Sequence, residues 1–372
     1  MESNTNSTRR IWAMAIVILA AVVIGSILIR NASVDTDVTR HTTKVGLIIN
    51  GSKADHSFCQ THYDALLRIQ DALNLEIVCR ENVPEDENSA GVIEKMIDEG
   101  CRFIIGASFG YGDYLVDAAK RHPEVYFLHP AGTEVGTNLS SVFGRMYQAR
   151  YLSGIVAGMR TKSGELGFVA AYPYPEVIRG INAFTLGVRS VAPEARVYVR
   201  YCESWVDDAA AEKACTGMLD DHPGIDVLSM HTNSLKPNEI AEKRGIWSVG
   251  YNVNNASMFP ESYLTACEWQ WDVYYRESIL SCLQGKFHGE NVWVEMDEGI
   301  VELSELTKNA APGTKEAVEE AKKRLQSRKY DVFYGPIIDN AGKLRVPKGE
   351  SMSDEDLLNN FDWYVEGVSV EK

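Results

Sequence analysis

Short apolar runs alternate with amphipathic segments from residue 44 onward, and this alternation predicts strands separated by helices. The expected strands of a first series are 45–50, 75–79, 103–107 and 125–128. The expected helices between them are 58–73, 88–99 and 111–121. Strands that are apolar on both faces and separated by helices are typical of a parallel sheet covered on both sides.

The same pattern restarts near residue 145. The helices expected in this second series are 145–159, 176–191, 208–219 and 238–243. Its expected strands are 166–171, 197–201, 225–230 and 246–251. The two series are similar in length but share no residue-level repeat. We therefore predict an α/β protein with two doubly wound, Rossmann-like lobes joined by a hinge.

The expected lobe boundaries follow from the points at which each series ends. Lobe 1 is expected to comprise 44–142 plus 253–290, and lobe 2 is expected to comprise 143–252 plus 291–372. The hinge crossings are then expected near 140–145, 251–255 and 286–292.

An uncharged apolar run of 19 residues, Ile11 to Ile29, lies close to the N-terminus. As a helix it would be about 28 Å long, close to the ~30 Å hydrocarbon core of a bilayer. Arg9 and Arg10 precede it, so the positive-inside rule predicts a cytosolic tail over 1–10, a transmembrane signal anchor over 11–29 and a linker over 30–43. A cleaved signal peptide is the alternative, disfavoured because the run is long and no small-x-small cleavage site follows it. The remaining chain is expected at the extracytoplasmic face of the cell membrane.

Composition narrows the classes of function. The net charge of the 372 residues is -15, and an acidic surface repels phosphate backbones, so nucleic-acid binding is not expected. Seven cysteines occur without a C-x-x-C pair, so no zinc-type cluster is expected. Outside the cytosol one or two disulfides are possible, but an odd count leaves at least one thiol free.

The stretch K-A-D-H-S-F-C-Q-T-H (53–62) first suggests metal or thiol chemistry. His56, Cys59 and His62 would fan over about 120° of a helix, which is wide for three ligands of one ion. An exposed His56, a buried Cys59 and a surface His62 are the simpler expectation. No general base accompanies Cys59, and S-F-G-Y-G-D (108–113) lacks the spacing of a phosphate-binding loop. We expect no metal, no cofactor and no catalytic residue.

Aromatic and amide residues recur where the expected strands end, which is where doubly wound sheets bind ligands. They are Phe58, Phe109, Tyr172, Tyr174, Trp205, Tyr251, Trp269, Trp271, Asn50, Asn233, Asn252, Asn254 and Gln270. A flat heterocycle binds well between two rings with neutral amides at its edge. This pattern predicts a small heteroaromatic ligand.

Several segments carry a family resemblance. They include A-D-H-S-F-C-Q (54–60), Y-L-S-G-I-V-A-G-M-R-T-K-S-G-E-L-G-F-V-A (151–170) and D-W-Y-V-E-G-V (362–368). From Lys44 to the C-terminus the chain resembles the basic membrane protein family, the extracytoplasmic solute-binding proteins of ABC transporters. The resemblance implies a type I periplasmic-binding fold, a ligand such as a purine nucleoside, and ABC permease subunits as membrane partners.

The family's site residues map onto this chain only in part. The resemblance implies that Phe58 and Trp205 hold the base between them. Asn50 stands where the family has an acidic residue, and Asn252 stands where it has an aspartate implied to bind ribose hydroxyls. Trp269 stands where it has a lysine. The other expected ligand-binding residues are Asp55, as a helix cap or pocket-edge acceptor, and Phe109, Tyr172 and Asn233.

These departures remove the charged partners that a sugar would need. A hydroxyl-binding site without its partners discriminates strongly against the sugar. We therefore expect a free purine nucleobase to be favoured over a nucleoside. The alternatives are a nucleoside-binding transporter component, a membrane-tethered ligand sensor of the same fold, and an enzyme acting on nucleosides.

Overall fold

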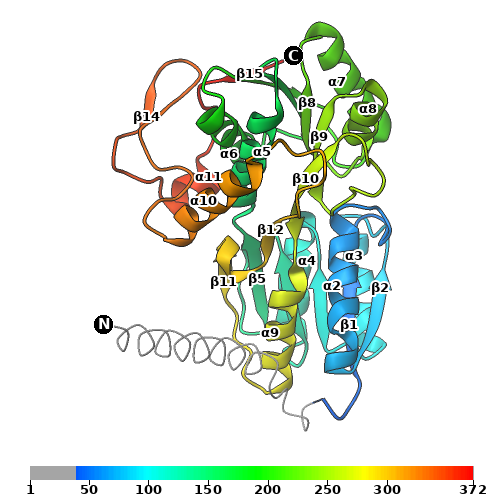
Figure 1. Ribbon diagram of the computed structural model, residues 1–372. Helices are drawn as coiled ribbons and strands as arrows, with labels where there is room; N and C mark the ends of the chain where they lie inside the picture. The colour runs from blue at the N-terminus through cyan, green and yellow to red at the C-terminus, as the bar shows by residue number, and fades with distance from the viewer. Residues whose placement is uncertain (1–38, 372) are drawn as a thin grey trace, which may run out of the picture.

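The computed structural model describes residues 39–371, which form two lobes, each built on its own sheet (Figure 1). A small two-stranded sheet, β13 (Ile337–Ile338) with β14 (Leu344–Val346), is attached to the second lobe. The predicted transmembrane segment 11–29 lies outside the described residues. Among residues 39–371, no helix is both long and apolar enough to span a membrane.

The first lobe contains a six-stranded, all-parallel sheet in the order β11-β5-β4-β3-β1-β2. Its strands are β1 (Thr43–Ile48), β2 (Leu75–Arg80), β3 (Phe103–Gly106), β4 (Tyr126–Pro130), β5 (Leu139–Gly144) and β11 (Asn291–Val294). Its helices are α2 (Phe58–Leu73), α3 (Asn88–Asp98), α4 (Gly112–Arg121) and α9 (Trp271–Leu283), with a 3-10 turn η1 (Phe109–Tyr111). Leu47 packs in the core with α2, whereas Ile48 packs in the core with α3 and α4. Both side chains are fully buried, which explains the uninterrupted apolar run.

The second lobe contains a seven-stranded sheet in the order β12-β10-β9-β8-β6-β7-β15, parallel except for β12. Its strands are β6 (Glu165–Ala170), β7 (Arg196–Tyr201), β8 (Val227–His231), β9 (Trp247–Asn252), β10 (Tyr263–Trp269), β12 (Val301–Leu303) and β15 (Val368–Val370). Its helices are α5 (Met146–Arg160), α6 (Pro175–Val191), α7 (Asp208–Asp221), α8 (Lys236–Arg244), α10 (Thr314–Gln326) and α11 (Asp354–Asn359), with a 3-10 turn η2 (Met296–Glu298). The predicted α/β class with parallel sheets in two lobes is confirmed.

The chain passes between the two sheets three times. It does so between β5 and α5, between β10 and α9, and between β11 and β12. The first passage falls where the sequence predicts it. The structure places β10 in the second sheet and β11 in the first, whereas the sequence assigned 253–290 to lobe 1 and 291–372 to lobe 2. The cause is pairing, because β10 is held between β9 and β12, and β11 is held against β5.

Helices α5 and α6 pack with their backbones in close contact. A Cβ atom added at Gly154 would lie 2.1 Å from the carbonyl oxygen of Phe184, and one added at Gly187 would lie 2.0 Å from that of Tyr151. Such distances are far below van der Waals contact, so both positions require glycine for this packing.

We expect Gly154→Ala to lower the free energy of unfolding by about 1–3 kcal/mol, because a methyl group would force the two helices apart. Urea denaturation followed by circular dichroism measures the change. Gly91→Ala on α3 is the matched control, since nothing lies within 4 Å of a Cβ added there. That variant should keep or gain stability, by up to ~1 kcal/mol from helix propensity. Equal losses in both variants would contradict the close-packing argument.

Candidate ligand-binding site

The carboxyl ends of the two sheets meet through direct hydrogen bonds between the lobes. Asn252, the last residue of β9, donates from Nδ2 to Oγ of Ser57 at 2.9 Å and to Oδ1 of Asn233 at 3.1 Å. Nδ2 of Asn255 donates to the carbonyl oxygen of His56 at 3.0 Å. Residues 56–57 belong to the first lobe and the three asparagines to the second. The segment before α2 therefore lies directly against the strand ends of the second lobe.

Trp269 completes this network at its buried side. Its indole Nε1 donates to Oδ1 of Asn252 at 3.1 Å, and only 2% of Trp269 and 1% of Asn252 are exposed. The structure thus brings together Asn233, Asn252 and Trp269, three of the residues predicted from the sequence, beside the segment that leads into Phe58.

Phe58 is half-buried at the first turn of α2, where other aromatic rings fix it. Its ring lies edge-on to His62 at 4.5 Å and to Trp271 at 6.3 Å. Trp271 stacks on Trp269 at 4.5 Å with 13° between their planes. A chain of ring contacts therefore runs from Phe58 through Trp271 to Trp269, the last residue of β10.

Trp205 lies on the opposite lobe, in the loop after β7, within a second group of rings. Tyr172 lies 5.9 Å away edge-on and Tyr174 6.5 Å away, and Tyr174 is 53% exposed. The carbonyl oxygen of Trp205 accepts a hydrogen bond from the backbone N–H of Asn233 at 2.8 Å. Asn233 in turn lies 3.4 Å from Oγ of Ser57, so Trp205 and Phe58 are held near each other across the lobes. Among residues 39–371, no ring contact joins them directly.

Asn50 and Phe109 lie at the strand ends of the first lobe. Nδ2 of Asn50 donates to Oε2 of Glu85 at 3.2 Å and to Oγ of Ser108 at 3.3 Å. Glu85 also accepts from the hydroxyl of Ser108 and from the backbone N–H of Gly110. A carboxylate from the loop before α3 therefore stands beside the position where the family carries an acid, and sequence reasoning missed it. Phe109 is 72% exposed, the most exposed large apolar side chain among the described residues.

Asp55 caps the first turn of α2. Its carboxylate accepts from the backbone N–H groups of Ser57 at 2.8 Å, Gln60 at 3.0 Å and Cys59 at 3.1 Å. Burial raises the pKa of Asp55, and these three donors oppose that shift. The expected capping role is confirmed, and the carboxylate is already engaged by the backbone.

His56, Cys59 and His62, the residues that first suggested metal or thiol chemistry, do not share one environment. His56 is exposed and Cys59 is buried, as expected, but His62 is fully buried rather than at the surface. His62 stacks on Trp271 at 4.7 Å, and its Nδ1 is hydrogen-bonded to the hydroxyl of Tyr275. Burial raises the pKa of the Cys59 thiol well above its usual range, which makes it a poor nucleophile. All seven cysteines are free thiols in the structure.

A carboxylate that the sequence reasoning did not single out lies at the start of α6. Glu176 follows Tyr174 by two residues, and its Oε1 lies 3.6 Å from Nε2 of the buried His231. Burial raises the pKa of Glu176, but the contact with His231 and the charges of Arg179 and Arg150 outweigh burial and hold the pKa below its ordinary value. The available signal was its position as the first residue of the helix expected over 176–191.

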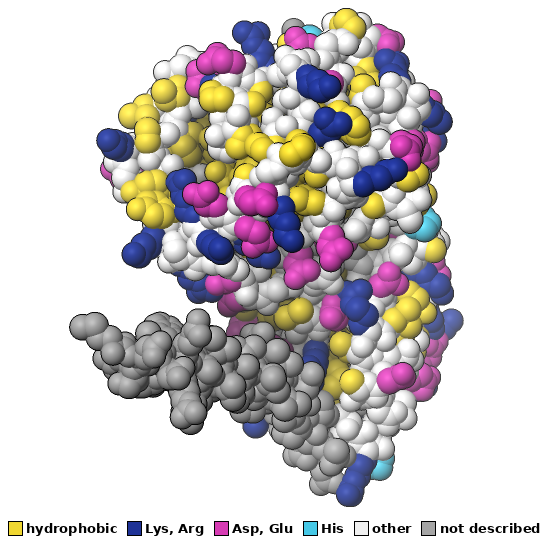
Figure 2. Space-filling model, in the orientation of Figure 1, with side chains coloured by type: hydrophobic (Ala, Val, Ile, Leu, Met, Phe, Trp, Pro, Cys, Tyr) yellow, Lys and Arg dark blue, Asp and Glu magenta, His cyan; other side chains and the backbone are white. Residues whose placement is uncertain are grey.

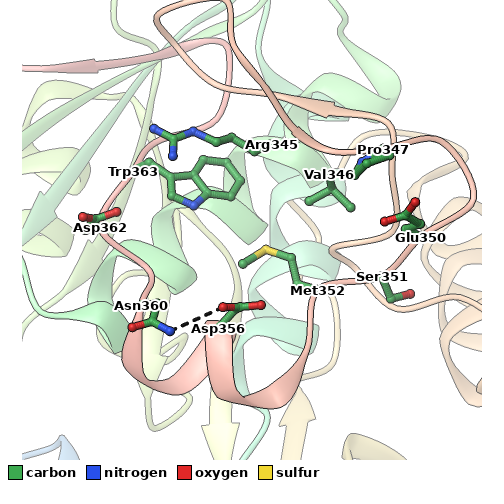
Figure 3. A pocket seen from close by; sticks show the side chains of 10 residues that line it. All are labelled: Arg345, Val346, Pro347, Glu350, Ser351, Met352, Asp356, Asn360, Asp362 and Trp363. Atoms are coloured by element: carbon green, nitrogen blue, oxygen red, sulfur yellow. Dashed lines mark hydrogen bonds between the residues drawn. The ribbon is translucent and has the colours of Figure 1, made fainter.

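One hollow among the described residues lies away from the strand ends, in the β14–α11 region of the second lobe (Figure 3). It has a volume of about 360 Å³. Its lining residues are Arg345, Val346, Pro347, Glu350, Ser351, Met352, Asp356, Asn360, Asp362 and Trp363. The guanidinium of Arg345 lies 5.3 Å from the Trp363 ring and is paired with Asp339, so its charge is already compensated. Among residues 39–371, no group of three or more His, Cys, Asp or Glu side chains is arranged to hold a metal ion.

We expect His62 to make the fold sensitive to acid. Burial lowers its pKa from 6.5 to about 3, so the unfolded chain binds the proton first as the pH falls. Stability that is present above about pH 6.5 is therefore lost as the pH falls toward 3. Between pH 7 and 5 the wild type should lose about 2 kcal/mol more free energy of unfolding than His62→Gln. Denaturant titrations at both pH values measure this difference, with exposed His56→Gln expected to follow the wild type.

Comparison with known proteins agrees with this architecture. Residues 42–335 match the family described as ABC transporter substrate-binding protein, PnrA-like. The chain is 33% identical over 327 residues to a purine-binding protein of Brucella abortus, which covers 87% of this chain and 92% of that relative. It is 32% identical over 284 residues to a putative ABC transporter glucose-binding protein of Haloferax volcanii, which covers 76% of this chain and 69% of that relative.

A solved structure supports the fold. An ABC transporter solute-binding protein from Conexibacter woesei superposes with a TM-score of 0.67 at 18% identity, covering 78% of this chain and 98% of that one. The family match spans most of the chain, and both sequence relatives exceed 30% identity. The chain therefore belongs to the PnrA-like family of ABC transporter substrate-binding proteins.

Proposed function

We propose that this protein captures a free purine nucleobase between its two lobes and presents it to an ABC permease. The observation that carries the proposal is the closed, buried network of Ser57, Asn252 and Trp269 beside an aromatic ring on each lobe. The ring-binding part of the site is present, whereas the part that would hold a sugar is occupied by the protein itself.

The clamp consists of Phe58 from the first lobe and Trp205 from the second. Each ring is fixed by aromatic neighbours on its own lobe, Phe58 by His62 and Trp205 by Tyr172. A ligand that contacts both lobes stabilises the closed arrangement, because closure follows differential affinity for the two arrangements. A flat heterocycle meets this requirement with its two faces.

The sugar side of the site is filled and uncharged. Trp269 stands where the family carries a lysine, and Asn252 stands where it carries an aspartate. Both side chains are almost completely buried and are hydrogen-bonded to each other. A ribose would have to displace an indole that is stacked on Trp271, and the Asn252 and Trp269 side chains themselves offer its hydroxyl groups no ionised acceptor.

The purine class is supported by the Brucella abortus relative, whose name describes purine binding. The putative glucose-binding relative is nearly as similar, so the ligand assignment depends on the aromatic clamp and not on identity alone. We place the protein at the extracytoplasmic face of the membrane, with ABC permease subunits as partners and without catalysis. This placement rests on the family and on the apolar segment 11–29.

We expect free bases to bind more tightly than their nucleosides, by about tenfold or more, because the sugar meets a filled and uncharged wall. Isothermal titration calorimetry with adenine, guanine, xanthine and the corresponding nucleosides measures the order. Glucose is the control ligand from a different chemical class. Tighter binding of nucleosides would reject the free-base preference, and tighter binding of glucose would reject the purine class.

We expect Phe58→Ala and Trp205→Ala each to weaken binding of the preferred base by about 1–3 kcal/mol, by analogy with base–aromatic stacking on single strands. The same titrations measure the loss. Tyr330→Ala, an aromatic truncation outside the strand-end region, is the matched control and should leave the affinity unchanged. Wild-type affinity in both clamp variants would refute the clamp.

A further inference from the structure

The second lobe carries an unused ionised acceptor beside the proposed clamp. Glu176 lies in the first turn of α6, and one third of its side chain is exposed. Among residues 39–371 its one close polar contact is with Nε2 of His231 at 3.6 Å, which is longer than an ordinary hydrogen bond. His231 therefore holds the carboxylate of Glu176 only loosely, and no donor of residues 39–371 lies within ordinary hydrogen-bond distance of its oxygens.

The other candidate carboxylates at the strand ends are already engaged. Asp55 accepts from three backbone N–H groups, and Glu85 accepts from Asn50, Ser108 and Gly110. Glu268 accepts from the backbone N–H of Asn254. Glu176 differs from all of these because its nearest donor, Nε2 of His231, lies beyond ordinary hydrogen-bond distance.

The surroundings of Glu176 keep it charged. Arg150 and Arg179 are both buried, and Arg150 is held by the carbonyl oxygen of Met230 at 2.8 Å and lies 3.9 Å above the Tyr251 ring. Burial lowers the pKa of His231, so the imidazole is neutral near pH 7. With His231, Arg150, Arg179 and Tyr251 as its titratable neighbours, the carboxylate stays ionised and acts only as an acceptor.

The carboxylate lies one ring away from the clamp. Trp205 and His231 are 5.9 Å apart between ring centroids, and His231 also contacts Glu176. Tyr172 and Tyr174, which contact the Trp205 ring, come just before α6 in the sequence. Trp205 and Glu176 therefore share His231 as a neighbour at the strand ends of the second lobe.

We propose that Glu176 reads the edge of the bound base and selects purines with two adjacent N–H donors, as in guanine. This inference rests on the proposed function, because it assumes a base in the clamp. A carboxylate accepts two parallel hydrogen bonds from neighbouring donors, and such charge-assisted pairs are strong and directional. Guanine presents N1–H beside its 2-amino group, whereas adenine presents an acceptor at N1 beside its 6-amino group. Placing that acceptor against an ionised carboxylate leaves both unpaired.

The test is equilibrium dialysis of the full-length protein with labelled guanine and labelled adenine. The wild type should bind guanine at least tenfold more tightly than adenine. Glu176→Gln keeps the shape of the side chain but replaces one acceptor by a donor, so it should lose at least tenfold in guanine affinity and change adenine affinity less than threefold. Glu319→Gln, the same change at an exposed position on α10, is the matched control and should alter neither.

A second variant guards against a folding defect. Glu176→Asp keeps the charge and shortens the side chain, so it should retain the preference for guanine at reduced affinity. Because the pKa of Glu176 is held below its ordinary value, wild-type guanine affinity should also be constant between pH 8 and 5. Preference of the wild type for adenine, or equal losses for both bases in Glu176→Gln, would overturn the assignment of Glu176 alone. Failure of the wild type to bind any purine base would overturn the proposed function and this assignment together.

Discussion

The stack of Trp269 on Trp271 is the contact on which the rest of the site depends. The two indoles, 4.5 Å apart and nearly parallel, join the last residue of β10 in the second lobe to the first residue of α9 in the first. The stack fixes the Trp269 N–H against Asn252, and Asn252 can then direct its amide toward Ser57. Aromatic pairs in this geometry contribute more than their buried area alone.

The other two passages between the lobes join the same cluster. Phe143, at the end of β5, packs against Trp269 at 4.9 Å. Arg145 at the first passage pairs with Glu295 at the third, with 3.0 Å between Nε and Oε1, and lies 4.0 Å above the Trp293 ring. Hinge motions are absorbed by a few residues at the ends of elements. Here the residues at the passages are large and packed through ring contacts and an ion pair.

The sequence predicted most of the fold because its signals were local. The helix expected over 58–73 is α2 with the same limits, and every expected strand of both series overlaps an observed one. After Asn252 the prediction assigned strands to the wrong lobe, because strand pairing decides which sheet each strand joins. β5 was missed because its buried Ser140 and Ser141 interrupt the apolar run, and β10 was assigned to the wrong lobe because nothing local states that it pairs with β9. Figure 2 shows charged side chains of both signs scattered over the coloured part of the face in view, in keeping with the ordinary composition.

Site residues could be predicted where position at a strand end was the whole signal. They were missed where a residue's place depends on a partner from a distant segment. Asn233, Asn252 and Trp269 were predicted from their positions at strand ends, and the structure brings them together beside Ser57, which precedes Phe58. Glu85 and the burial of His62 depend on neighbours distant in sequence, Asn50 in one case and Trp271 in the other. Period and composition carry no information about such partners.

The position of Trp269 has an evolutionary consequence. The same indole packs between the lobes and would form the wall of the proposed pocket, so ligand choice and packing between the lobes would share one residue. A substitution that opened space for a larger ligand would also loosen the stack, and its effect would depend on what occupies 252 and 271. New ligand classes would then arise in this lineage through coordinated changes at several positions, because single steps pass through forms that neither bind nor close well.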